Sequence, residues 1–138
     1  MSERSNQKII LLAEDDIDDR ELFSEALANI SSQTILHSTE NGKEALKRLG
    51  EMDTIPDLIF LDINMPVMNG WECLQSLKSD KKYKHIPVII YSSSSHQREK
   101  DTAMEMGAAR FFTKPNDFYE FKDKLEEIIT TPGRLRGD

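Results

Sequence analysis

The sequence of 138 residues contains a single cysteine, Cys73, and it contains no long apolar run. One cysteine excludes a disulfide bond within the chain and makes a cluster of thiolate metal ligands implausible. A membrane-spanning helix needs about 20 mainly apolar residues. The polar start MSERSNQK also lacks the apolar core of a signal peptide. We therefore expect a protein of the cytoplasm.

The sequence also has fewer basic than acidic residues. Asp and Glu together number 25 against 18 Lys and Arg, so the net charge is −7. This balance argues against nucleic acid or an anionic membrane surface as a partner. The length and the 38% hydrophobic content suit one globular domain with its own core. We expect that domain to span 1–138, with a core of about 8–130, flexible termini and no second domain after it.

Five short apolar runs alternate with stretches in which apolar residues recur at helical spacing. The runs are KIILLAE (8–14), TILHS (34–38), DLIFLD (57–62), PVIIYS (87–92) and ARFFTK (109–114). Nearly continuous apolar runs of this length are typical of strands buried on both faces of a parallel sheet. The alternation of strand and helix predicts an α/β fold with right-handed crossovers and helices on both faces of the sheet.

Polar side chains end four of these runs. In an open parallel sheet, ligands bind beyond the carboxyl ends of the strands, so these side chains are the informative ones. If the first, third, fourth and fifth strands lie side by side, their ends meet at one rim, and the second strand is an edge. The residues concerned are Glu14, Asp15, Asp16, Asp62, Ser92 and Lys114.

This combination of side chains indicates phosphoryl chemistry at an aspartate. Clustered carboxylates repel one another unless a cation neutralises them, and oxygen ligands alone suit Mg²⁺ or Mn²⁺. A lysine and a hydroxyl beside them suit a phosphoryl group, with a carboxylate as the nucleophile. Taken singly, each residue is more ordinary. The run EDDIDD also suits an exposed acidic helix start, an interpretation we favour for Asp18 and Asp19.

Four motifs resemble the receiver domain of two-component response regulators, over roughly 8–129. LLAEDD is similar to the acidic pair of that family, LDINMPVMNG to its phosphoacceptor loop, IIYSS to its switch hydroxyl, and FFTKP to its lysine and following proline. The resemblance implies a flavodoxin-like, doubly wound (βα)5 fold with a five-stranded parallel sheet in the order 2-1-3-4-5. It also implies a single-domain, CheY-like member.

The resemblance assigns a role to each residue of the acidic rim. Asp62 would accept a phosphoryl group from a histidine kinase or a phosphotransfer protein. Asp15 and Asp62 would bind Mg²⁺ (or Mn²⁺), Asn64 would add its backbone carbonyl, and Glu14 would hold the ion through water. Lys114 would pair with the phosphoryl group. The chain would catalyse only its own phosphotransfer and dephosphorylation, and would otherwise not be an enzyme.

The resemblance also implies a switch. Phosphorylation would draw Ser92 inward, reorient Phe111, and change the surface of the fourth and fifth strands and helices, where a downstream protein would bind. Ser92 stands where threonine is common, and Phe111 lacks the hydroxyl of a tyrosine. The peptide bond between Lys114 and Pro115 would be cis. The sequence leaves open whether the chain forms oligomers.

Two other functions remain open at this stage. The chain could be an interaction module that uses the receiver fold without phosphorylation, although receivers of that kind usually lack one of the rim residues. It could also be a phosphatase of the haloacid-dehalogenase type, which also uses an aspartyl nucleophile after a strand. Such an enzyme would need a second acid two residues after Asp62, where this chain has Asn64.

Overall fold

The structure is a computed structural model that describes residues 7–30 and 33–130. Within these residues, five strands alternate with five helices. The strands are β1 (Lys8–Ala13), β2 (Thr34–Thr39), β3 (Leu58–Asp62), β4 (Val88–Ser92) and β5 (Arg110–Thr113). The helices are α1 (Ile17–Ile30), α2 (Gly42–Glu51), α3 (Gly70–Lys78), α4 (Gln97–Glu105) and α5 (Phe118–Ile129). Each predicted strand agrees with the structure to within one residue at either end. The expected flexible termini lie outside the described residues.

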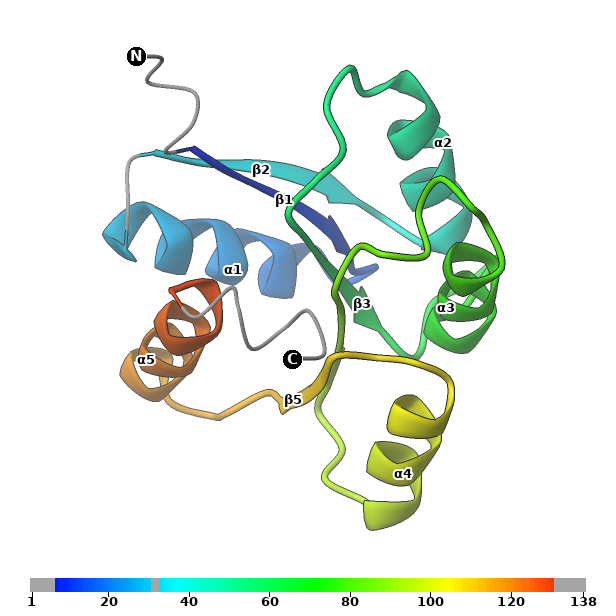
Figure 1. Cartoon of the computed structure of the whole chain (residues 1–138). Helices are drawn as coiled ribbons and strands as arrows, with labels where there is room; N and C mark the ends of the chain where they lie inside the picture. The colour runs from blue at the N-terminus through cyan, green and yellow to red at the C-terminus, as the bar shows by residue number, and fades with distance from the viewer. Residues whose placement is uncertain (1–6, 31–32, 131–138) are drawn as a thin grey trace.

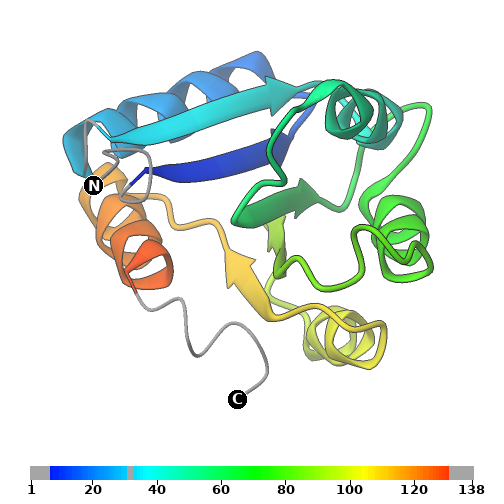
Figure 2. The same cartoon turned by 45° about the horizontal axis from the view of Figure 1, so that its top comes forward.

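The strands form one parallel sheet in the order β2-β1-β3-β4-β5. This order confirms the predicted fold, including the position of the second strand at an edge. Helices α1 and α5 lie together on one face of the sheet, and α2, α3 and α4 cover the other (Figure 1). Figure 2 shows the same two helical layers in a second orientation.

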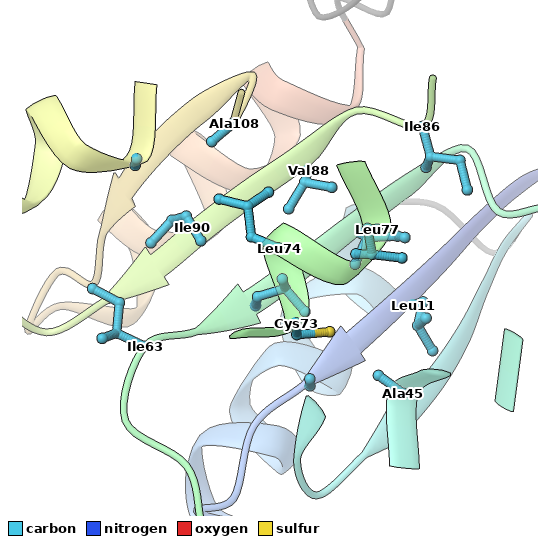
Figure 3. Packing of buried hydrophobic residues seen from close by; sticks show 14 of the residues in the cluster. Leu11, Ala45, Ile63, Cys73, Leu74, Leu77, Ile86, Val88, Ile90 and Ala108 are labelled. Atoms are coloured by element: carbon cyan, nitrogen blue, oxygen red, sulfur yellow. The ribbon is translucent and has the colours of Figure 1, made fainter. Parts of the chain in front are cut away.

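Each face of the sheet has its own apolar core, which explains the continuous apolar runs. In β1, Leu11 and Ala13 belong to the core under α2, α3 and α4, whereas Ile10 and Leu12 belong to the core under α1 and α5. Successive side chains of a strand point to opposite faces, so a strand covered on both sides has to be apolar throughout. Figure 3 shows the first of these cores, in which α3 packs on the sheet.

The core under α1 and α5 is built around aromatic rings. Phe23 of α1 contacts the rings of Phe60, Tyr91 and Phe121, with centroids 5.0 to 5.9 Å apart and steep interplanar angles. Edge-to-face pairs of this kind add to the free energy gained by burying the rings. Phe112 of β5 completes the group, at 5.7 Å from Tyr91. The ring of Tyr91 is 1% exposed although it stands directly before the polar rim.

Local capping fixes where the helices begin. Asn69 accepts a hydrogen bond from the backbone of Glu72, and Glu72 bonds back to the backbone of Asn69, which starts α3. At the start of α5, the side chain of Asp117 accepts a hydrogen bond from the backbone N–H of Glu120 at 2.9 Å. Within residues 7–30 and 33–130, no helix is both long and apolar enough to cross a membrane.

Candidate functional site

The carboxyl ends of β1, β3 and β5 bring the predicted residues to one cleft of about 490 Å³. The residues that line it are Glu14, Asp15, Asp16, Ile17, Asp18, Asp19, Asp62, Asn64, Ser93 and Lys114. The strand order makes this convergence possible, because β1 and β3 are neighbours and β4 joins β3 to β5. Ser92 is 2% exposed, and its neighbour Ser93 lines the cleft instead.

Lys114 is the centre of the charge network. Its Nζ donates to Glu14 Oε1 at 2.6 Å and to Asp19 Oδ2 at 3.1 Å, and it lies 3.7 Å from Asp62 Oδ2. It also lies 4.4 Å from the centroid of the Tyr91 ring, within the range of a cation–π contact. The ammonium group is therefore held between three carboxylates and one aromatic face.

The expected cis peptide bond before Pro115 is wrong, because the described residues contain no cis peptide bond. The lysine is directed into the cleft by other means. Its backbone N–H donates to Ser92 O at 2.7 Å, which continues the pairing of β5 with β4 by one residue. The side chain is then held by its acidic partners.

The acidic residues of the run EDDIDD make three different kinds of contact, and the sequence predicted only some of them. Glu14 turns into the cleft. Asp16 Oδ1 accepts the backbone N–H of Asp19 at 3.1 Å, at the start of α1. Asp19 was expected to be a solvated helix residue, but it pairs with Lys114. An acidic residue in the first turn of a helix gives no sign in the sequence of such a partner.

Glu14 and Asp62 are buried carboxyls that influence each other. Burial raises the pKa of Glu14 from 4.5 to about 7, although its hydrogen bond from Lys114 opposes the shift and the nearby charge of Asp62 adds to it. Burial likewise raises the pKa of Asp62 against the attraction of Lys114. Burial alone disfavours charge on Lys114, but its bond to Glu14 and the charges of both carboxylates raise its pKa overall. The cleft therefore holds excess negative charge that a cation would relieve.

The acidic residues fit a hard divalent cation. One carboxylate oxygen from each of Glu14, Asp15 and Asp62 lies within 4.8 Å of the others, and Asn64 lines the same cleft. Oxygen ligands at this spacing suit Mg²⁺ or Mn²⁺, which are bound by a few carboxylates and completed by water. Asp15 is exposed, so solvent reaches the group from that side. These residues could hold a metal ion.

The loop from Asp62 to α3 is tied down at both ends. The backbone N–H of Ile63 donates to Asp62 Oδ1 at 2.8 Å, and Gly70 N–H donates to Ile63 O at 2.9 Å. Further along, Gly42 N–H of α2 donates to Met68 O at 3.0 Å. Trp71 is half-buried against the core under α2, α3 and α4. These hydrogen bonds hold in place the loop that follows the carboxylate of Asp62.

Val67 is the one residue of this loop with unfavourable backbone geometry. Its φ is +67°, and the N–H of Met68 donates to Pro66 O at 2.6 Å, which closes a tight turn around it. A β-branched residue rarely adopts a positive φ, and such a conformation costs about 1–3 kcal/mol. Sequence patterns did not reveal this strain, because Gly and Asn are the usual signals of a positive φ.

The two predicted switch residues lie in different surroundings. Ser92 Oγ accepts the backbone N–H of Ser94 at 3.0 Å, inside the loop that leads to α4. Phe111 is half-buried against the core under α2, α3 and α4. It lines a second cleft of about 400 Å³, together with residues of α5 and with Lys100 of α4. Phe111 therefore lies apart from the acidic cleft, on the surface of α4, β5 and α5.

Comparison with known proteins agrees with this geometry. Residues 10–126 match the family described as response regulator receiver domain. A chemotaxis protein CheY homolog of Campylobacter jejuni is 30% identical over 122 residues, which are 88% of this chain and 92% of that protein. A protein-glutamate methylesterase/protein-glutamine glutaminase of Bacillus licheniformis is 33% identical over 134 residues, which are 92% of this chain. The chain spans only about a third of the length of the first curated relatives. It covers 36% of the Bacillus licheniformis protein.

Solved structures give the same result. The phosphorylated cyanobacterial phytochrome response regulator RcpA is 31% identical, with a TM-score of 0.81 and coverage of 88% of this chain and 91% of that one. The Mn²⁺-bound form of response regulator Rcp1 is 26% identical, with a TM-score of 0.79 and coverage of 90% and 93%. The sheet order, the acidic cleft and these matches lead to one conclusion: the chain belongs to the response regulator receiver domain family.

Proposed function

We propose that this receiver domain is a phosphorylation-activated switch in which Asp62 is the phosphoacceptor. One observation carries the proposal. Asp62 is 8% exposed at the end of a fully buried strand, 3.7 Å from the ammonium of Lys114 and grouped with two further carboxylates. A buried carboxylate is costly unless it is compensated, so its presence at the mouth of a cleft favours a chemical role.

The carboxylate of Asp62 acts as the nucleophile. One of its oxygens bonds to the phosphorus of a phosphohistidine on a histidine kinase or a phosphotransfer protein, while the N–P bond breaks and leaves its electron pair on the ring nitrogen. Lys114 then neutralises part of the charge on the phosphoryl oxygens. Asp15, Asp62 and the Asn64 carbonyl would hold Mg²⁺, with Glu14 bonded through water. When bound, that ion supplies charge neutralisation and orients the phosphoryl group.

The switch connects the acidic cleft with the surface of α4, β5 and α5. Ser92 Oγ already accepts a bond from Ser94, so its hydroxyl hydrogen can be donated to a phosphoryl oxygen. The backbone N–H of Lys114 donates to Ser92 O, so the ends of β4 and β5 would respond together to phosphorylation. Phe111, the second residue of β5, lines the cleft that a downstream protein would occupy. The proposed location is the cytoplasm.

Phosphorylation by a small donor tests this proposal. Phosphoramidate with Mg²⁺ is expected to add one phosphoryl group to the wild type, and Asp62→Asn is expected to abolish the labelling because the amide is not a nucleophile. Phos-tag electrophoresis or intact-mass measurement reads the result. Asp16→Asn is the matched control, since Asp16 lines the same cleft and asparagine can still cap α1. Equal labelling of Asp62→Asn and the wild type would refute the assignment.

Magnesium binding is expected to depend on pH in a definite direction. Because the pKa values of Glu14 and Asp62 are raised, protons compete with Mg²⁺ for the same oxygens at low pH. Mg²⁺ should therefore raise Tm more at pH 8 than at pH 5.5. At one hundred times Kd the stabilisation is about 2.7 kcal/mol. Differential scanning fluorimetry measures this, and Asp15→Asn should remove most of the shift. A shift that is equal at both pH values would argue against binding by these carboxylates.

A further inference from the structure

Val67 combines strain with exposure, and the two together need an explanation. Its φ is +67°, yet its side chain is 75% exposed, so burial does not compensate for the unfavourable backbone. Glycine or asparagine would adopt the same conformation at lower cost. The chain thus keeps an apolar, β-branched side chain in solvent at a position where stability alone favours another residue.

The surrounding loop holds this side chain in a fixed place. Met68 is bonded on both sides, through its N–H to Pro66 O at 2.6 Å and through its carbonyl to Gly42 N–H at 3.0 Å. The base of the loop is closed by the bond from Gly70 N–H to Ile63 O at 2.9 Å. An apolar group presented on a rigid loop loses little conformational entropy when a partner covers it, so it can contribute to binding at low cost.

Val67 belongs to the loop that begins directly after Asp62, so a protein that reacts with Asp62 approaches this loop. It follows Asp62 by five residues, so its Cα is at most about 18 Å away even along a fully extended chain. A protein donor has to bring a histidine nitrogen to within about 3 Å of the point of reaction. The surface around that histidine then covers the rim of the cleft. Ile17, which lines the cleft and is 59% exposed, is an apolar side chain that such a donor would also cover.

We propose that Val67 is a contact residue for the protein phosphodonor and that the strained turn serves to present it. The proposal rests on the proposed function and deepens it: the donor carries an apolar patch beside its phosphohistidine, and that patch packs on Val67. Transfer from a small donor does not use this contact. Val67 therefore acts in recognition of the donor and takes no part in the chemical step.

The experiment compares two donors that contain the same N–P bond. One is a purified histidine-containing phosphotransfer domain, phosphorylated on its histidine and selected because it labels the wild type. The other is monophosphoimidazole, which has no protein surface. The variants are Val67→Asn, which removes the apolar group and relieves the strain, and Val67→Leu, which keeps an apolar group without β-branching. Ile55→Asn is the control, since Ile55 is 45% exposed at the other end of β3.

Val67→Asn is expected to raise Tm by about 3 °C and yet to slow transfer from the protein donor by about tenfold. Its labelling by monophosphoimidazole should stay unchanged. Val67→Leu and Ile55→Asn should keep the wild-type rate with both donors. A residue with a purely structural role would not gain stability while it loses transfer from one donor alone.

Two outcomes would overturn the proposal, and they differ from failure of the proposed function. If Val67→Asn accepts phosphate from the protein donor at the wild-type rate, Val67 is not a donor contact. If it slows with both donors equally, the effect belongs to the acceptor site itself. If neither donor labels Asp62 in the wild type, the phosphoacceptor assignment is wrong, and the inference falls with it.

Discussion

Gly70→Ala is expected to destabilise the domain by about 3 kcal/mol, near the upper end for overpacking of a closed site. A Cβ at position 70 would lie 2.2 Å from the carbonyl oxygen of Asp62 and 3.0 Å from Ile63 Cα. Both are backbone atoms, so no side chain can rotate away. The loop would have to move, and the bond between Gly70 N–H and Ile63 O would be lost with it. Labelling by phosphoramidate should fall too, because the displaced backbone is that of the acceptor.

Urea denaturation followed by circular dichroism measures the free energy of unfolding of this variant. Gly50→Ala is the matched control, because a Cβ at Gly50 would meet no atom within 4 Å and alanine is a better helix former than glycine. Gly50→Ala should therefore be neutral or slightly stabilising. A Gly70→Ala variant as stable as the wild type would show that the loop does not pack against Asp62 in the manner described.

Lys114→Met is expected to cost about 3 kcal/mol at pH 8 and to reduce labelling by phosphoramidate more than about tenfold. The variant keeps a long side chain but removes the charge that pairs with Glu14 and Asp19. Glu14 is 1% exposed, so its carboxylate would be left buried without its partner. Lys81→Met, at an exposed lysine, is the control and should leave both properties unchanged. Normal labelling of Lys114→Met would remove the lysine from the phosphoryl site.

The pH dependence of stability gives a second test of the same network. The pKa of Glu14 in the folded state, about 7, lies above its ordinary 4.5 because of burial. Between these values the folded state binds more protons than the unfolded state, so stability falls as the pH rises. In Lys114→Met the hydrogen bond and charge that oppose the shift are gone. Its stability should therefore continue to fall above pH 7, where the slope of the wild type levels off. Equal slopes for variant and wild type would contradict the coupling of Glu14 to Lys114.

The fold and the acidic cleft could be predicted from the sequence because their signals are local. Apolar runs of five to seven residues predicted each strand to within one residue at either end, since a strand buried on both faces admits few polar side chains. The residues that end those runs had to meet once the strand order was known. Glu14, Asp62 and Lys114 lie 48 to 100 residues apart in the sequence, yet the parallel order alone brings them together.

Other features depend on three-dimensional contacts that no local pattern encodes. The pairing of Asp19 with Lys114 depends on how α1 packs over the rim, and an acidic residue in a first helical turn looks the same whether or not it has a partner. Tyr91 is a polar aromatic residue before a serine, but four other rings enclose it. The strain at Val67 is hidden because valine ordinarily signals a strand.

The measurement that tests the central claim most directly is identification of the phosphorylated residue. The wild-type chain is treated with phosphoramidate and Mg²⁺ and then reduced with borohydride, which converts an aspartyl phosphate to homoserine. Tandem mass spectrometry of the peptide that contains DLIFLDINMPVMNG should place homoserine at position 62 and leave Asp57 unchanged. Homoserine at another aspartate, with Asp62 intact, would contradict the assignment of Asp62 as the phosphoacceptor.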